Sequence, residues 1–230
     1  MTGAGRNGKL RVVCFDVDGT LVHHAEGKTV WQVLNERFLG SDARNTERLL
    51  LFQAGRLAYD EWVRLDITDW IDRDVRRDDI ETAIRDTLTL VPGALETMDT
   101  LRRRGYGLAI VSGTLDVTLE LLLGGFTFDH VYSNRIHFAD DGRIASWSAT
   151  RYDVEGKARA LAEIAAAFGV TPADCAFVGD HWNDLPALRL AGLAVAFCPK
   201  DDVVRQAAHV VIENGPLTNL LPHFPEIERG

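Results

Sequence analysis

The sequence lacks the features of a membrane, secreted or nucleic-acid-binding protein. No apolar run approaches the ~20 residues of a membrane span, and the opening MTGAGRNGK has no apolar signal-peptide core. The three cysteines, Cys14, Cys175 and Cys198, have no paired spacing, which indicates buried, reduced thiols. Acidic residues (34) outnumber basic ones (25), and a net charge of -9 argues against binding a phosphate backbone. We therefore expect a soluble, cytoplasmic protein without a nucleic-acid or membrane partner.

The composition is that of an ordinary globular protein. Hydrophobic residues make up 46% and charged residues 26% of the 230 residues. This length allows one large domain, or a core with a smaller attached domain.

Apolar runs alternate with helical patterns over most of the chain. The run Leu10–Phe15 is typical of a central strand buried on both faces. Further strands are predicted at 108–111, 130–132, 175–178, 193–197 and 209–212. Helices are predicted at 92–104, 115–123, 156–168 and 203–207, and another is predicted to begin near residue 185. Residues 135–147 predict a hairpin around Asp141-Gly142. Strands alternating with helices indicate an α/β fold with a doubly wound parallel sheet.

Residues 23–90 differ in character. A polar loop is expected at 23–29, and apolar residues such as Val30, Leu34 and Phe38 then recur at helical spacing. Three or four helices are expected up to Thr87, with breaks at Gly40-Ser41 and at Gly55. We therefore expect a core formed by 9–22 and 91–230, interrupted by a helical insert at 23–90.

Two carboxylates follow the first strand directly. Asp16 and Asp18 stand at i and i+2 and so lie on the same side of the strand, next to a turn at Gly19. An acidic turn that merely caps the strand is the alternative reading. Ser112 and Asp180 follow two other predicted strands, and the carboxyl ends of parallel strands share one edge of the sheet. The sequence therefore predicts a polar site at that edge.

The motifs DVDGT, SGT, a lysine on a helix (Lys157) and GDHWND occur in this order, and with them the chain resembles the haloacid dehalogenase superfamily, in particular its phosphoserine phosphatase branch. The resemblance implies a Rossmann-like core with a helical cap at 23–90. It also implies a Mg²⁺-dependent phosphatase that hydrolyses a small phosphorylated metabolite through an aspartyl-phosphate.

The same resemblance implies a role for each motif residue. Asp16 would be the nucleophile and Asp18 the general acid and base. Asp16, Asp180 and the backbone carbonyl of Asp18 would bind Mg²⁺, with Asp184 in or just behind that ligand shell. The phosphate would be bound by Ser112, the Gly113 amide, Lys157 and Asn183.

Plainer interpretations of individual residues stay open. Lys157 could be a solvated charge, and Asp184 could be the N-cap of the next helix. His23 and His24 are expected to be exposed, while His181 and Trp182 are expected in a loop that could touch a substrate. Trp62, Leu65 and Trp70 form a stripe that favours a place in the core of the insert.

The substrate and the reaction also have alternatives. Glu26 and Arg64 are the nearest equivalents of the serine-binding residues of that branch, and neither is in register. A sugar phosphate, an amino-alcohol phosphate or a natural-product intermediate are therefore open as substrates. A phosphotransferase or mutase, and a non-catalytic phosphate-binding module, are the rival functions.

Overall fold

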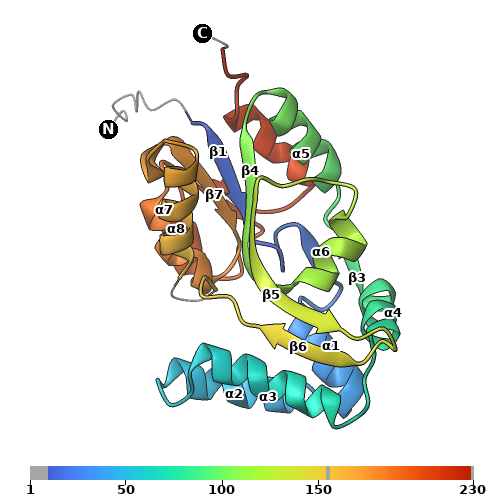
Figure 1. Cartoon of the computed structure of the whole chain (residues 1–230). Helices are drawn as coiled ribbons and strands as arrows, with labels where there is room; N and C mark the ends of the chain where they lie inside the picture. Colours follow the sequence, from blue (N-terminus) through green and yellow to red (C-terminus); the bar gives the residue numbers. More distant parts are fainter. Residues whose placement is uncertain (1–9, 154–155, 229–230) are drawn as a thin grey trace.

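The computed structural model describes residues 10–153 and 156–228 and contains a seven-stranded sheet in the order β6-β5-β4-β1-β7-β8-β9 (Figure 1). Residues 1–9, which contain the MTGAGRNGK segment, lie outside the described residues. The strands are β1 (Val12–Phe15), β4 (Gly107–Leu115), β5 (His130–Phe138), β6 (Ile144–Ser148), β7 (Cys175–Gly179), β8 (Leu193–Phe197) and β9 (Val210–Ile212). β6 pairs antiparallel with β5, and the other pairs are parallel. The predicted α/β fold with a parallel sheet is confirmed.

β1 lies at the centre of the sheet and contributes to a hydrophobic core on each face. Val13 and Phe15 belong to the core shared with α5 (Ala94–Arg103) and the 3-10 helix Leu217–His223. Val12 and Cys14 belong to the opposite core, shared with α7 (Lys157–Ala167), α8 (Leu185–Leu190) and α9 (Asp202–Ala207). Successive side chains of a strand point to opposite faces, so burial on both faces requires a continuous apolar run.

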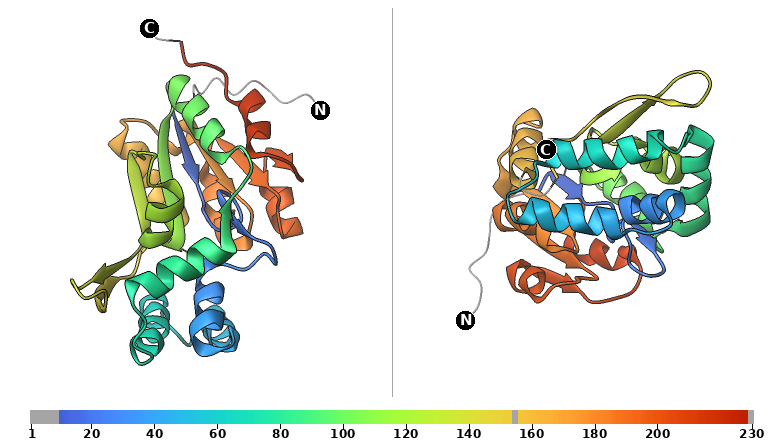
Figure 2. Two further views of the ribbon diagram at one scale, coloured as in Figure 1. Left: turned by 90° about the vertical axis from the view of Figure 1, so that its right-hand side faces the viewer. Right: turned by 90° about the horizontal axis from the view of Figure 1, so that it is seen from below.

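Four helices follow β1 and lie below the carboxyl ends of the strands (Figure 1). They are α1 (Val30–Leu39), α2 (Ala43–Gln53), α3 (Tyr59–Ile71) and α4 (Arg77–Thr87). Seen from below, α2 and α3 lie in front of the sheet (Figure 2). α1 ends at Gly40, which has φ +79° and its N–H on the Glu36 carbonyl. The predicted helices and their breaks are confirmed, and the division into core and cap stays a proposal.

The predicted polar loop at 23–29 is wrong at its start. Val22–His24 is strand β2, which pairs antiparallel with β3 (Leu88–Leu90), so that the two ends of the four-helix segment lie side by side. Three-residue strands are too short to show an alternating pattern, and their partners are separated by the whole helical segment. Only the folded chain brings them together.

β4 is longer than the sequence indicated. It runs through Ser112, Gly113 and Thr114 to Leu115, and its register with β5 shifts between Val111 and Leu115. The serine motif therefore lies in an irregular strand segment rather than beyond the strand end. A bulge of this kind redirects side chains next to a site. α6 (Asp116–Leu123) follows directly.

Two further sequence predictions can be compared with the structure. Cys14 and Cys175 are buried, Cys198 is half-buried, and all three are free thiols. Among the described residues, no helix is both long and apolar enough to cross a membrane. The cytoplasmic location stays a prediction.

Candidate active site

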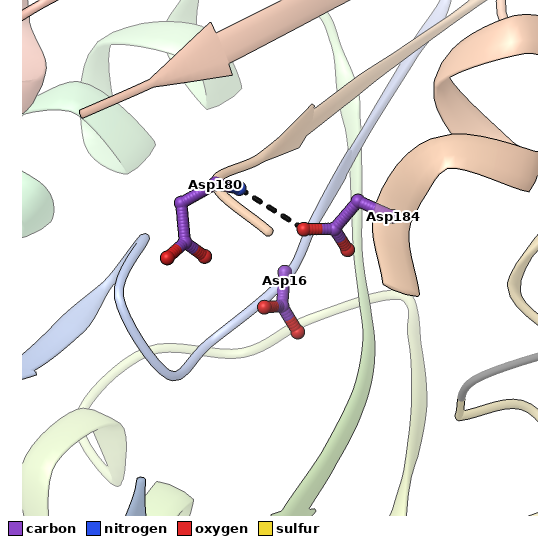
Figure 3. A group of neighbouring side chains, drawn as sticks. All are labelled: Asp16, Asp180 and Asp184. Atoms are coloured by element: carbon purple, nitrogen blue, oxygen red, sulfur yellow. Dashed lines mark hydrogen bonds between the residues drawn. The ribbon is translucent and has the colours of Figure 1, made fainter. Parts of the chain in front are cut away.

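Three buried carboxylates meet at the carboxyl edge of the sheet. Asp16 follows β1, Asp180 follows β7, and Asp184 directly precedes α8. One oxygen from each lies within 4.8 Å of the others, and the side chains surround a common space (Figure 3). Gly19 allows the Asp180 carboxylate to lie against the turn after β1, because a Cβ at position 19 would overlap that carboxylate. The φ of Gly19 is +96°, a conformation that favours glycine. The cluster is an oxygen-donor set that can hold a metal ion.

Lys157 is fully buried between two of these carboxylates. Its Nζ donates to Asp16 Oδ1 at 2.8 Å and to Asp184 Oδ1 at 2.7 Å. Burial alone would lower the pKa of Lys157, but the two carboxylates raise it above the ordinary value. The lysine is therefore a fixed cation in the site, and the alternative of a solvated charge is wrong.

Asp184 is more than a helix cap. Its side chain makes no capping bond to α8, but Oδ2 accepts from the backbone N of Asp180 at 3.0 Å and from that of His181 at 3.1 Å. These bonds hold the loop that carries Asp180 (Figure 3). Burial raises the pKa of Asp184 to about 6 and that of Asp180 to about 7. The site therefore favours bound cations.

Lys200 is a second cation of the site, and sequence reasoning missed it. Its Nζ lies 2.9 Å from Asp180 Oδ2. Lys200 comes three residues after the end of β8, so the strand-end rule that singled out Asp180 could also have found it.

Asp18 lies beside the cluster and faces the helical segment. Its Oδ1 accepts from the backbone N of Val30, the first residue of α1, at 3.1 Å. Burial, and then the negative charge of Asp16, raise the pKa of Asp18 to about 6. A carboxyl group with this pKa can both give and take a proton near neutral pH.

The SGT segment joins the core to the helical segment. Ser112 Oγ accepts from the Thr114 backbone N at 3.2 Å. The Gly113 carbonyl accepts from Trp31 Nε1 at 2.8 Å and from Asn134 Nδ2 at 2.6 Å. The same Asn134 amide group donates to the Tyr59 hydroxyl at 2.8 Å. Gly113 is thus held by one side chain of α1 and, through Asn134, is linked to α3.

Asp153 lies against the other side of Gly113. A Cβ on Gly113 would overlap Asp153 Oδ2, so glycine allows the carboxylate to approach. Asn183 Nδ2 donates to Asp153 Oδ1 at 3.3 Å, while the buried Asn183 Oδ1 has no partner among the described protein groups. Burial raises the pKa of Asp153. No motif marks this residue in the sequence.

Several of these groups line one cavity of about 300 Å³ between the sheet edge and the helical segment, whereas Lys157, Asp180 and Asp184 are buried outside its lining. Its walls include Asp16 and Asp18, which the sequence predicts to be catalytic, and Ser112, Gly113 and Asn183, which it predicts to bind phosphate. The remaining lining residues include Thr29, Trp31, Gln32, Asn45, Leu49, Trp62, Asp153, His181, Trp182 and Lys200. A cavity lined by several carboxyl groups, of which Asp18 and Asp153 have raised pKa values, is the expected form of an active site.

Several residues considered from the sequence fall elsewhere. Trp70 is buried in the hydrophobic core, but Trp62 lines the cavity, so the core interpretation of the stripe holds only in part. Glu26 is paired with Lys28 at 2.9 Å, and Arg64 with Glu61 at 2.6 Å, both at the surface and outside the cavity lining.

Comparisons with known proteins agree with this geometry. The chain matches the haloacid dehalogenase-like hydrolase family over residues 10–192. The phosphoserine phosphatase of Methanocaldococcus jannaschii is 28% identical over 223 residues, which cover 94% of this chain and 98% of that protein. A second phosphoserine phosphatase, from Streptomyces coelicolor, is 35% identical over 64% of this chain and 35% of its own length. A solved structure described as a phospho-aspartyl intermediate analogue of phosphoserine phosphatase has a TM-score of 0.73 at 27% identity, covering 94% of this chain and 99% of that chain.

The sheet, the carboxylate cluster at its carboxyl edge and the buried lysine define a hydrolase of the α/β class. The chain belongs to the haloacid dehalogenase-like hydrolase family, and within it resembles the phosphoserine phosphatase branch. The sequence-based predictions of this family and of the resemblance to this branch are both confirmed.

Proposed function

We propose that the chain is a Mg²⁺-dependent phosphatase that hydrolyses a small-molecule phosphate monoester through an aspartyl-phosphate. One observation carries the proposal: Asp16 lies in a cavity wall with a buried cation 2.8 Å from its Oδ1 and Asp18 beside it. A carboxylate held in this way is a positioned nucleophile next to a proton donor.

Asp16 and Asp18 divide the chemistry. Asp16 attacks phosphorus, and the bond from phosphorus to the leaving oxygen breaks as Asp18 gives that oxygen its proton. Asp18, now ionised, takes a proton from the water that attacks the aspartyl-phosphate, which releases phosphate and restores Asp16. The pKa of about 6 suits Asp18 to both steps.

The phosphoryl group is held by donors from three separate segments. Ser112 and the Gly113 amide approach from β4, Lys157 from the start of α7, and Asn183 from the 3-10 helix Trp182–Asp184 that precedes α8. Phosphoryl transfer needs little beyond positioning and neutralisation of the oxygen charges, which these donors provide.

The carboxylate cluster fits Mg²⁺. Asp16 and Asp180, with the Asp18 carbonyl, would hold the ion, and Asp184 would lie in or just behind this shell; all are the oxygen donors that a hard cation requires. Mg²⁺ bound there supplies positive charge to the transferring phosphoryl group. Lys200 neutralises Asp180 through the 2.9 Å contact between its Nζ and Asp180 Oδ2.

Residues 23–90 form the cap of this proposal, with the β2–β3 ribbon as its two crossings. The cap closes the cavity through Trp31, which reaches the Gly113 carbonyl, and through Tyr59, which accepts from Asn134. Closure excludes water from the nucleophile until the leaving group has departed.

The test is phosphate release from an aryl phosphate with Mg²⁺, comparing the wild type, Asp16→Asn and a matched control. Asp140→Asn, on the exposed β5–β6 hairpin, makes the same charge change outside the cavity. We expect turnover in the wild type and the control, none in Asp16→Asn, and none after chelation. Intact-mass analysis of acid-quenched wild type should detect a phosphorylated chain. Turnover that survives both Asp16→Asn and chelation would exclude the proposal.

A further inference from the structure

The part of the cavity formed by the helical segment has the composition of an ammonium site. Next to the main cavity lies a pocket of about 30 Å³, lined by Trp31, Tyr59, Trp62, Val63, Asp66 and Asp153. We call these six residues the aromatic pocket. Trp31, Trp62 and Asp153 also line the main cavity, so the two spaces adjoin.

The indole N–H groups of the aromatic pocket are already used. Trp31 Nε1 donates to the Gly113 carbonyl at 2.8 Å, and Trp62 Nε1 donates to Asp66 Oδ2 at 3.0 Å. What the two rings offer a ligand is therefore π surface rather than hydrogen-bond donors. Such a surface attracts cations, with an energy that increases when the site is shielded from water.

The two carboxylates of the aromatic pocket have different roles. Asp66 is buried and bound by Arg48, and it also accepts from Asn45 Nδ2 at 2.7 Å and from Trp62 Nε1. It is therefore neutralised and positions two residues of the cavity wall. Asp153 has no Lys or Arg within ion-pair distance among the described residues and lies at the junction with the main cavity.

The cavity also lacks the partner that a carboxylate ligand would need. Of its described lining residues, only Lys200 is a lysine or arginine, and it is paired with Asp180 on the metal side. Arg48 is held by Asp66 and Asp69. A substrate carboxylate placed near Asp153 would meet a negative charge, and Lys157, the cation whose charge acts on Asp153, is already paired with Asp16 and Asp184.

We propose that the leaving group is an alcohol that carries a primary ammonium and no carboxylate, with the ammonium bound in the aromatic pocket against Asp153. The inference rests on the proposed phosphatase function and specifies its substrate class. A volume of about 30 Å³ is enough for a group the size of a water molecule or an –NH₃⁺, and only a group with N–H bonds can donate to Asp153.

The test compares kcat/KM for four phosphate monoesters: 2-aminoethyl phosphate, its neutral analogue 2-hydroxyethyl phosphate, the trimethylammonium analogue and O-phosphoserine. A charge-assisted hydrogen bond with aromatic contacts predicts that the aminoethyl ester exceeds each of the others by about tenfold or more. An aryl phosphate is measured in parallel, as a substrate that needs no ammonium site.

Two variants connect any preference to the pocket. Asp153→Asn should lower the ratio of kcat/KM between the aminoethyl and hydroxyethyl esters by about tenfold, and Trp62→Leu should lower it by about threefold. Asp140→Asn should leave the ratio unchanged.

The outcomes separate the two levels of the proposal. Three results would overturn the ammonium site but not the phosphatase, provided that the aryl phosphate is hydrolysed. They are the absence of a preference for the aminoethyl ester, O-phosphoserine as the best substrate, and an unchanged kcat/KM ratio in both pocket variants. Failure to hydrolyse every ester, the aryl phosphate included, overturns the phosphatase and the substrate class with it.

Discussion

Replacing Asp18 by asparagine is expected to lower turnover by orders of magnitude and to stabilise the fold above neutral pH. Asp18 Oδ1 accepts a hydrogen bond from Val30 N at 3.1 Å, and asparagine keeps an oxygen at the same place. Burial and the charge of Asp16 raise the pKa of Asp18 from 3.8 to about 6. Ionising Asp18 therefore costs free energy in the folded state that it does not cost in the unfolded chain.

The direction of the pH effect follows from the raised pKa. Between pH 3.8 and about 6 the folded protein binds more protons at Asp18 than the unfolded chain, so stability falls as the pH rises through this window. Above that pH window, the pKa shift corresponds to a loss of about 3 kcal/mol in the free energy of unfolding. Water beside the half-buried side chain reduces this loss to about 2 kcal/mol. The variant has no charge at this position and does not lose this stability. Its free energy of unfolding should equal that of the wild type near pH 4.

Urea and thermal unfolding with a chelator present, at pH 4 and pH 8, measure this difference. At pH 8 the variant should gain about 2 kcal/mol, or roughly 4–8 °C in Tm for a chain of this size. Its phosphate release should fall by about 10²–10⁴-fold, because the proton donor is lost. Asp140→Asn should change neither the free energy of unfolding nor the phosphate release. A variant that is no more stable than the wild type at pH 8, or equally stabilised at both pH values, would refute the reasoning.

Two further substitutions test other parts of the site. Lys157→Met leaves Asp16 and Asp184 without their buried cation, so the free energy of unfolding in urea should fall by about 3–5 kcal/mol at pH 8; a fall below about 1 kcal/mol would contradict the ion-pair role. Trp31→Phe removes the donor to the Gly113 carbonyl, and should cost about 1 kcal/mol and speed amide hydrogen exchange in α1. Unchanged exchange there would show that this bond does not hold the cap.

Much of the fold could be predicted from the sequence because its signals are local. The apolar run before Asp16, the helical spacing from Val30 and the breaks at Gly40 and Gly55 each depend on a few neighbouring residues. The strand-end rule then placed Asp16 and Asp180 at one edge of the sheet, and the structure brings them together with Asp184. These features follow from strand and helix periodicity alone.

The side of the cavity that we propose binds the leaving group was decided only by the tertiary structure. Trp31 meets Gly113 across 82 positions of sequence, and Asn134 meets Tyr59 across 75. Asp153 belongs to no motif, and the aromatic pocket becomes visible only when α1, α3 and the loop before α7 pack together. The sequence by itself determined the reaction-bearing edge of the sheet, where local strand geometry positions the groups. The folded chain decided what surrounds the substrate, because those contacts join segments that share no local pattern.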